Sequence, residues 1–479
     1  MKIIQPANEK ILRRLERFFW NYDEKLQYKI AGYVIPVDSG NETTLLYNDV
    51  TKELIELDPG EDIFTQFFLM HLFIVPMEFN ETVIPMTVRE IFTSQRNYDL
   101  RPMGYTILTT TACNARCFYC YEKNDPKKPM SEKTANDVAD FIIKNYEKYG
   151  PKPEELQPDA NGKIPTPASV RLSWFGGEPL FRKKCINIIC SKLKEAKIPY
   201  VSSMISNGYL FNDETVKEAK ELWRLRNVQI TVDGTRDIYN KTKAYIYKDE
   251  DPFETIMGNI ERLTNYKVRV SIRINVGMFN IEDVKKLIEE IGFRFGGNRF
   301  VSVYLHSLFD AFESDMTSEE NNRIVFTKMA EFEDIIRDMG LGSSGKMLNN
   351  SYSGTHCMAD SGKHLCILTD GRLTLCEHYT HSNEIGTIYD FPEKIDYDMM
   401  AKYHEIKEPY PRCYSCPLFA DCSYLKICAD NDNVCSEARQ QYLISKLIRR
   451  IKMRYDAEPR RETPLEEPHN EEEIKSAEC

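Results

Sequence analysis

The sequence has no long hydrophobic run and no excess of positive charge. No stretch approaches the roughly 18 apolar residues that a membrane-spanning helix needs, and the first residues lack the apolar core of a secretory signal peptide. The formal net charge of −11 argues against a partner that is bound through nucleic-acid phosphates. We therefore expect a cytoplasmic protein that binds neither a membrane nor a nucleic acid.

Cysteine, by contrast, is plentiful, with 14 residues in a chain of 479. In a reducing compartment these thiols stay free and available to metal. Three of them lie between residues 113 and 120, and eight more lie between Cys357 and Cys435. Cys185 and Cys190 fall on a helical pattern and are expected to be buried core thiols.

The first cysteine group is a single loop. Cys113, Cys117 and Cys120 are separated by three and then two residues, and they follow a strand-like run at 105–111. Thiolates this close in sequence can reach different irons of one iron–sulfur cube. A [4Fe–4S] cube has one more iron than this loop has cysteines, which leaves an iron open for chemistry. The alternatives are a zinc site, which prefers paired CxxC units and four ligands, and a disulfide loop.

Strand-like and helix-like segments alternate between residues 101 and 310. The strand-like segments are 105–111, 170–175, 201–206, 228–232, 268–276 and 300–305, and helical patterns such as 131–149, 212–225 and 281–291 separate them. Parallel strands with helical crossovers produce this alternation. We predict an α/β fold, a partial (β/α)6 barrel, with its active site at the carboxyl ends of the strands.

Four phrases at those strand ends carry a resemblance. They are the CxxxCxxC loop with Tyr119 before its last cysteine, Trp174-Phe-Gly-Gly-Glu-Pro179, Ser206-Asn-Gly208 and Gln229-Ile-Thr-Val-Asp-Gly234. Together they resemble the motifs of the radical SAM superfamily. The resemblance implies an enzyme in which a [4Fe–4S] cluster binds S-adenosylmethionine (SAM) and cleaves it reductively. The resulting 5′-deoxyadenosyl radical would abstract hydrogen from an unactivated position.

The same resemblance implies which residues contact SAM. They are Tyr119, Gly176, Gly177, Glu178, Ser206, Thr231, Lys243 and Arg273. Thr231 takes the place of a serine, and Lys243 stands where the family usually has an arginine, offering a point charge rather than a planar fork. Arg273 is a further cation on a barrel strand. By residue type alone, Asp233 and Asn207 are turn formers.

The second cysteine group resembles the SPASM domain of peptide-maturing enzymes, which implies two auxiliary [4Fe–4S] clusters. By position, Cys413, Cys416, Cys422 and Cys435 would ligate one cluster, and Cys357, Cys376 and Cys428 the other, with Cys366 as its fourth ligand. Five residues separate Cys422 from Cys428 where the family usually has three, an insertion that affects the assignment of Cys428. A zinc module built on the CxxC pair is the alternative.

Glu377 directly follows Cys376, where related enzymes carry an acidic residue that takes a proton from the substrate. A base beside a cluster is chemically sensible, because oxidation of a substrate releases a proton as well as an electron. The alternative is a solvated or cluster-shielding carboxylate.

The chain divides into five predicted segments. Residues 1–100 form an α+β region that resembles the leader-recognition segments of peptide maturases, with strand-like runs at 27–36, 43–47 and 53–57. Residues 101–310 form the barrel, 311–350 a helical linker, 351–436 the SPASM domain, and 437–479 a helix with an acidic, disordered tail. Alternatively, the first segment is a structural cap on the barrel.

These observations predict an oxidoreductase that modifies a ribosomally made precursor peptide by installing a thioether or C–C crosslink. The precursor would carry a leader, and a flavodoxin or ferredoxin would supply electrons. One alternative is a sulfatase-type maturase that makes formylglycine. The other is a zinc- or cluster-bearing interaction protein without enzymatic activity.

Overall fold

The computed structural model describes residues 1–94, 100–123, 126–151, 169–247, 251–308, 319–342, 348, 357–378, 383–406, 408–422, 426 and 435–458. The predicted cluster ligand Cys428 and most of the predicted tail lie outside these residues. Within them the chain forms a nine-stranded sheet, a four-stranded sheet and a two-stranded ribbon.

The predicted α/β fold is confirmed. Six strands run parallel in the order β12-β11-β10-β9-β8-β7. They are β7 Gly104–Thr110, β8 Val170–Gly176, β9 Tyr200–Ser206, β10 Leu225–Thr231, β11 Arg269–Val276 and β12 Val301–Ser307. Each lies within about three residues of its predicted position, because the alternation of buried and half-buried residues along the strands is already present in the sequence.

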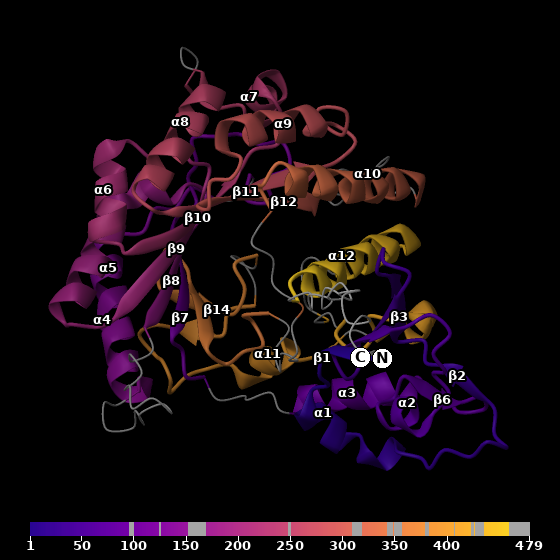
Figure 1. Cartoon of the computed structure of the whole chain (residues 1–479). Helices are drawn as coiled ribbons and strands as arrows, with labels where there is room; N and C mark the ends of the chain where they lie inside the picture. Colours follow the sequence, from indigo (N-terminus) through magenta and orange to yellow (C-terminus); the bar gives the residue numbers. More distant parts are fainter. Residues whose placement is uncertain are drawn as a thin grey trace, which may run out of the picture.

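Helices cover one face of this sheet (Figure 1). They are α4 Glu132–Tyr149, α5 Lys183–Glu195, α6 Asp213–Glu221, α7 Arg236–Lys243, α8 Pro252–Asn265 and α9 Val284–Phe295. Their apolar residues pack on the outward residues of the strands, such as Trp174 and Ile272, in one large core. Cys185 and Cys190 are buried there on α5.

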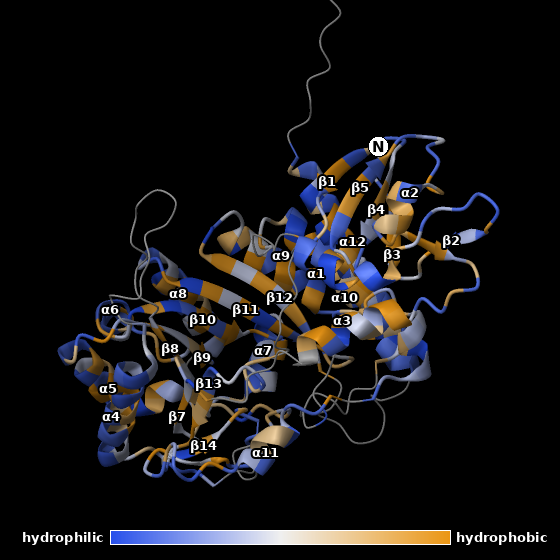
Figure 2. Cartoon of the chain, turned by 90° about the horizontal axis from the view of Figure 1, so that it is seen from below, coloured by the Kyte–Doolittle hydropathy of each residue, from blue (hydrophilic) through white to orange (hydrophobic). Residues whose placement is uncertain are grey.

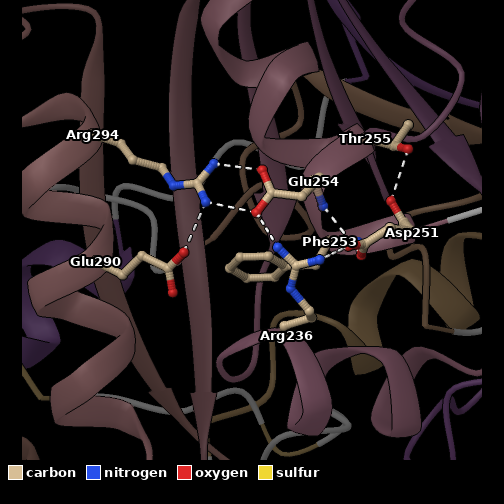
Figure 3. Close-up of polar contacts among 7 residues, drawn as sticks. All are labelled: Arg236, Asp251, Phe253, Glu254, Thr255, Glu290 and Arg294. Atoms are coloured by element: carbon tan, nitrogen blue, oxygen red, sulfur yellow. Dashed lines mark hydrogen bonds and ion pairs between the residues drawn. The ribbon is translucent and has the colours of Figure 1, made fainter.

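An ion network on the outer surface links α7, α8 and α9 (Figure 3). Arg294 donates to both carboxylate oxygens of Glu254 at 2.7 and 2.8 Å, and Arg236 pairs with Glu254 and Asp251. Arg294 also lies over the ring of Phe253. Exposed ion pairs contribute little individually, but this network joins the three consecutive helices that carry the loops after β10 and β11.

The cysteine-rich segment extends the barrel sheet. β13 His364–Ile367 pairs in parallel with β7, and β14 Arg372–Thr374 and β15 Gly386–Thr387 follow in antiparallel order. A short helix, α11 Tyr397–Lys402, comes next. Gly104 allows the close contact of β7 with β13, because a Cβ atom there would lie 2.6 Å from the His364 ring.

The first 94 residues form their own sheet in the order β1-β5-β4-β3. The strands are β1 Lys2–Gln5, β3 Val34–Asp38, β4 Thr44–Asn48 and β5 Glu53–Leu57. The single predicted run at 27–36 is wrong in one respect. It breaks at a turn in which Val34 N–H bonds to Ala31 C=O, so its first part becomes β2 Tyr28–Ile30, which pairs with β6 Ile74–Pro76 in a separate ribbon.

The helices of this region are α1 Glu9–Arg14, α2 Gln66–Met70 and α3 Val83–Ser94, with a 3-10 turn at Glu16–Phe18. Helix α3 was not predicted from the sequence. Pro85 reads as a helix breaker, but it lies in the first helical turn, where its missing N–H costs no hydrogen bond.

Two long helices, α10 Glu319–Asp338 and α12 Glu437–Asp456, lie side by side (Figure 1). Arg449 of α12 donates to both carboxylate oxygens of Asp334 on α10. The other face of α12 packs on the N-terminal sheet through Leu447 and Ile451. No helix of the described residues is long and apolar enough to cross a membrane.

Candidate active site

The first cysteine loop follows β7 at the carboxyl end of the parallel strands. Cys113, Cys117 and Cys120 are half-buried free thiols. Two backbone hydrogen bonds fix the loop to the segment after α7: Arg116 N–H donates to Lys243 C=O at 2.8 Å, and Ile246 N–H donates to Asn114 C=O at 2.9 Å.

These thiols suit a metal cluster by their chemistry. Burial, followed by the nearby charge of Glu178, raises the pKa of Cys113 to about 12, and burial also raises the pKa of Cys117 and Cys120. Such thiols ionise when a cationic metal centre offsets the cost of burying the thiolate. Among the residues with described positions, no three His, Cys, Asp or Glu side chains form a ready-made single-ion site. The assignment therefore depends on loop position and donor type.

The double glycine after β8 lies against this loop. Gly177 N–H donates to Thr110 C=O and Glu178 N–H to Ala112 C=O, each at 2.9 Å. A Cβ atom on Gly176, which has a φ of +125°, would lie 2.1 Å from Thr110 O, and one on Gly177 would lie 2.5 Å from Ala112 O. Both glycines are required here because two backbones approach closely.

The Glu178 carboxylate points into the protein. It is completely buried, and it accepts hydrogen bonds from Ser206 Oγ at 3.0 Å, Asn207 N–H at 2.9 Å and Leu180 N–H at 3.1 Å. Glu178 and Ser206 thus join the loops after β8 and β9. Burial raises the pKa of Glu178 to about 7.

We expect the pH dependence of unfolding to change in Glu178→Gln. The folded-state pKa of Glu178 lies above the ordinary glutamate value of about 4.3, so the parent loses stability as the pH rises from about 4 to about 7. The variant should lack this part of the loss. Chemical denaturation at a series of pH values measures it, with Glu195→Gln, on the surface end of α5, as the control. Parallel pH profiles for parent and Glu178→Gln would contradict the expectation.

Tyr119 joins a buried group of three. Lys243 Nζ lies 2.9 Å from Asp233 Oδ2 and donates to Tyr119 Oη at 2.6 Å, and Tyr119 Oη donates to Asp233. The side chains of Lys243 and Asp233 are 3% and 0% exposed. Lys243 is thus engaged with Asp233, and Asp233, expected to form a turn, instead anchors the cysteine loop to β10 and α7.

Asn207 forms the expected turn and also contacts the cysteine loop. Its Oδ1 accepts from Tyr209 N–H at 3.0 Å, as in an Asx turn, while its Nδ2 donates to Asn114 Oδ1 at 2.6 Å and toward Cys113 Sγ at 3.7 Å. Asn114 is completely buried inside the cysteine motif, a role that its sequence does not indicate, because nothing in its residue type distinguishes it from a loop residue.

The open face of the sheet is polar. Hydrophilic and hydrophobic residues alternate along the strands (Figure 2). The polar residues that are half-buried there include Ser173, Ser203, Gln229, Thr231, Ser271, Arg273, Tyr304 and His306. Tyr304 Oη donates to Gln229 Oε1 at 2.6 Å, and Arg273 Nε donates to Asn275 Oδ1 at 2.8 Å. A face of this kind can bind a polar ligand. Thr231 and Arg273 are neighbours across β10 and β11 on it.

The second cysteine group divides into two places. Cys413, Cys416, Cys422 and Cys435 are half-buried, and the charges of the other three act on the pKa of Cys422, which burial raises to about 12. Cys366 is completely buried on β13, with Cys376 and Glu377 close enough to act on its pKa. Cys357 is exposed. The described cysteines form no disulfide.

Glu377 lies beside the first cysteine loop. Its charge, with those of Glu122, Cys120 and Cys376, acts on the pKa of Tyr121, which burial raises above the usual range. The ring of Tyr121 stacks on His378 at 4.6 Å between centroids. The fold therefore brings the segment Cys376–His378 next to Cys120–Glu122, a proximity that sequence could not reveal.

Comparison with known proteins places this geometry in a family. The model of the radical SAM superfamily matches residues 107–291. An uncharacterized protein of Methanocaldococcus jannaschii is 21% identical over 294 residues, which cover 60% of this chain and 90% of that protein. The sporulation killing factor maturation protein SkfB of Bacillus subtilis is 22% identical over 40% of this chain and 39% of its own length.

Among solved structures, native anSMEcpe with bound AdoMet and Cp18Cys peptide has a TM-score of 0.54 at 15% identity, covering 74% of this chain and 99% of that one. It supports the fold. The matched family model spans β7 to α9, the elements that carry the CxxxCxxC loop and the double-glycine turn. Residues 107–291 are therefore a radical SAM domain, which makes the protein an enzyme, and SAM and a [4Fe–4S] cluster are the cofactors of that superfamily.

Proposed function

We propose that this enzyme modifies a ribosomally made peptide, closing a thioether or C–C crosslink. The observation that carries the proposal is the radical SAM loop with a second cysteine group beside it, where Cys376 and Glu377 lie near Cys120. Support comes also from SkfB, named as a maturation protein, and from anSMEcpe, solved with a peptide.

Cys113, Cys117 and Cys120 would hold the cluster that binds SAM, and together these cofactors supply the radical that removes a hydrogen atom from the substrate. The protein's own residues set the geometry. Glu178, Ser206 and Lys243 hold the loops, while Tyr119, the double glycine, Thr231 and Arg273 lie along the site where SAM would bind. Glu377, beside the cysteine loop, would take the proton released as the crosslink forms.

The cysteines of the second group would hold auxiliary clusters. Cys413, Cys416, Cys422 and Cys435 would ligate one, and Cys357, Cys366, Cys376 and Cys428 the other. Such clusters accept the electron that leaves the substrate when a new bond closes. A flavodoxin or ferredoxin would supply the electron that starts turnover.

A direct test uses the short reading frames beside the gene as sources of peptide. The purified enzyme, SAM, a reductant and each peptide are incubated without oxygen, and mass spectrometry follows 5′-deoxyadenosine and the peptide. A crosslink removes two hydrogen atoms and joins two residues in fragment spectra. An aldehyde that reacts with a hydrazide probe would instead indicate formylglycine. No SAM cleavage with any reductant would contradict the proposal.

The N-terminal region is our candidate for holding the peptide. The predicted strands at 43–47 and 53–57 would bind an extended leader only if one of them lay at an open edge, but β4 and β5 are the two central strands of their sheet. The edge strand β3 is poorly suited to a further strand, because Pro36 has no N–H and Val34 N–H is already bonded to Ala31. Strand addition at these places is therefore not supported.

Exposed hydrophobic side chains offer another surface. Those around the β2–β6 ribbon include Leu26 at 53%, Ile30 at 41% and Met77 at 43% exposed, and Met77 N–H bonds to Gln27 C=O across the ribbon. Burying such side chains against an apolar part of a leader is favourable. We propose that the leader binds here.

We expect Leu26→Asp and Met77→Asp each to weaken peptide binding by roughly tenfold, the loss of about 1.4 kcal/mol of apolar contact. SAM cleavage without peptide should stay unchanged. Phe293→Asp is the matched control, because Phe293 on α9 is 93% exposed and far along the chain from this ribbon. Fluorescence anisotropy with a labelled peptide measures the affinity. Equal effects of all three substitutions would contradict the assignment.

A further inference from the structure

The N-terminal region holds the loop of the second cysteine group. Within the segment 413–422, backbone hydrogen bonds run from Cys416 to Cys413, from Phe419 to Cys416 and from Cys422 to Leu418. Two side chains of this loop pack into two different hydrophobic clusters of the N-terminal region. Leu418 packs against α12 and the four-stranded sheet. Ala420 packs into the core formed with α2 and α3.

Arg89 on α3 contacts this loop through its whole guanidinium. Nη1 donates to Phe419 C=O at 3.1 Å and to Cys422 C=O, and Cζ lies 4.6 Å from the centre of the Phe419 ring. The backbone carbonyl of Cys422, a predicted cluster ligand, therefore accepts a hydrogen bond from the positively charged Arg89 side chain.

Lys52 forms a second link. Its side chain, 2% exposed, lies 2.5 Å from Asp421 Oδ2 and 2.7 Å from Asp49 Oδ1. Asp421 immediately precedes Cys422. The φ of Lys52, +61°, is a conformation that L-residues seldom adopt, and Gln5 Nε2 secures the Lys52 carbonyl at 2.6 Å. Gln5 and Asp49, which belong to the N-terminal region as Lys52 does, thus fix the position of the Lys52 ammonium group.

We infer that Arg89 and Lys52 are positioning residues for an iron–sulfur site at Cys413, Cys416, Cys422 and Cys435. The inference rests on the proposed function, because that proposal assigns these cysteines to a cluster. The N-terminal region then has a second task besides binding peptide. It fixes the cluster loop and places a positive charge beside it, which favours the reduced, more negative cluster.

The test uses the full chain with Cys113, Cys117 and Cys120 replaced by alanine, so that only the second cysteine group contributes iron. Three variants are compared in this background: Arg89→Gln, Arg89→Lys and Asp421→Asn. Asp421→Asn removes the ion pair between Asp421 and Lys52, and the buried Lys52 ammonium keeps Asp49 as its charged partner. Arg17→Gln is the control. Arg17 also donates a hydrogen bond to α3, at Thr87, but its guanidinium lies over Phe18 and not over Phe419 of the cysteine loop.

Arg89→Gln should release iron to a ferrous chelator roughly 10- to 100-fold faster than the background and lower the midpoint potential in a redox titration followed by electron paramagnetic resonance. Arg89→Lys should retain most of the potential, because the charge remains, while losing the two carbonyl contacts. Asp421→Asn should also release iron faster, and it serves as the test if Arg89→Gln does not fold. Arg17→Gln should change neither quantity.

The inference is overturned if Arg89→Gln and Asp421→Asn match Arg17→Gln in both measurements. That result would leave the proposed clusters intact, since the background would still hold iron. A background chain without any iron would overturn the proposed clusters, and the inference with them, whereas SAM cleavage by the unsubstituted enzyme would still stand.

Discussion

Replacing Cys113, Cys117 and Cys120 together with alanine is expected to abolish SAM cleavage. The iron content of the anaerobically purified protein should fall by about four per chain, from about twelve to about eight if both auxiliary clusters form. The three thiols come from one loop after β7, and no other described cysteine follows a strand of the barrel at that edge. Iron analysis and the release of 5′-deoxyadenosine measure the two effects.

The matched control is the double variant Cys185→Ala, Cys190→Ala. Both thiols are completely buried on α5, in the core between helix and sheet. Their loss should reduce stability through lost packing but leave iron and SAM cleavage as in the parent. An iron content that does not fall in the triple variant would remove the first cluster from this loop.

Lys243→Met is expected to cost about 3–5 kcal/mol of unfolding free energy, because it leaves the charge of Asp233 buried without its partner. Both side chains are almost inaccessible, and Tyr119 bonds to each. The variant should also loosen the cysteine loop, since Arg116 is bonded to the backbone of residue 243. Denaturant-induced unfolding followed by circular dichroism measures the stability.

The double variant Lys243→Met, Asp233→Asn should recover most of that loss, because neither charge remains, while the amide still accepts a hydrogen bond from Asn275 N–H. Lys241→Met is the control for a lysine of the same helix, since Lys241 is exposed. Asp233→Asn is also measured alone. If its loss of stability and that of Lys243→Met simply add in the double variant, the buried ion pair does not stabilise this junction.

Local patterns in the sequence determined the barrel. Strand alternation, helical periodicity and the cysteine spacing each depend on residues within one element, so they predicted β7 to β12 and located the CxxxCxxC loop at the carboxyl edge. The glycines at 176 and 177 were also identified, although the structure gives the physical reason as contact with the backbone of Thr110 and Ala112.

Only the tertiary structure decided which side chains hold the loops together. Glu178 and Lys243 carry charges that a motif assigns to SAM, yet their carboxylate and ammonium groups are buried against Ser206 and Asp233. The strand order of the N-terminal sheet, which decides its edges, likewise depends on pairing between separate strands. The contact of Arg89 with Cys422 joins residues that are far apart in the chain. Such pairings arise from the packing of whole elements, a property that no local pattern of residues contains.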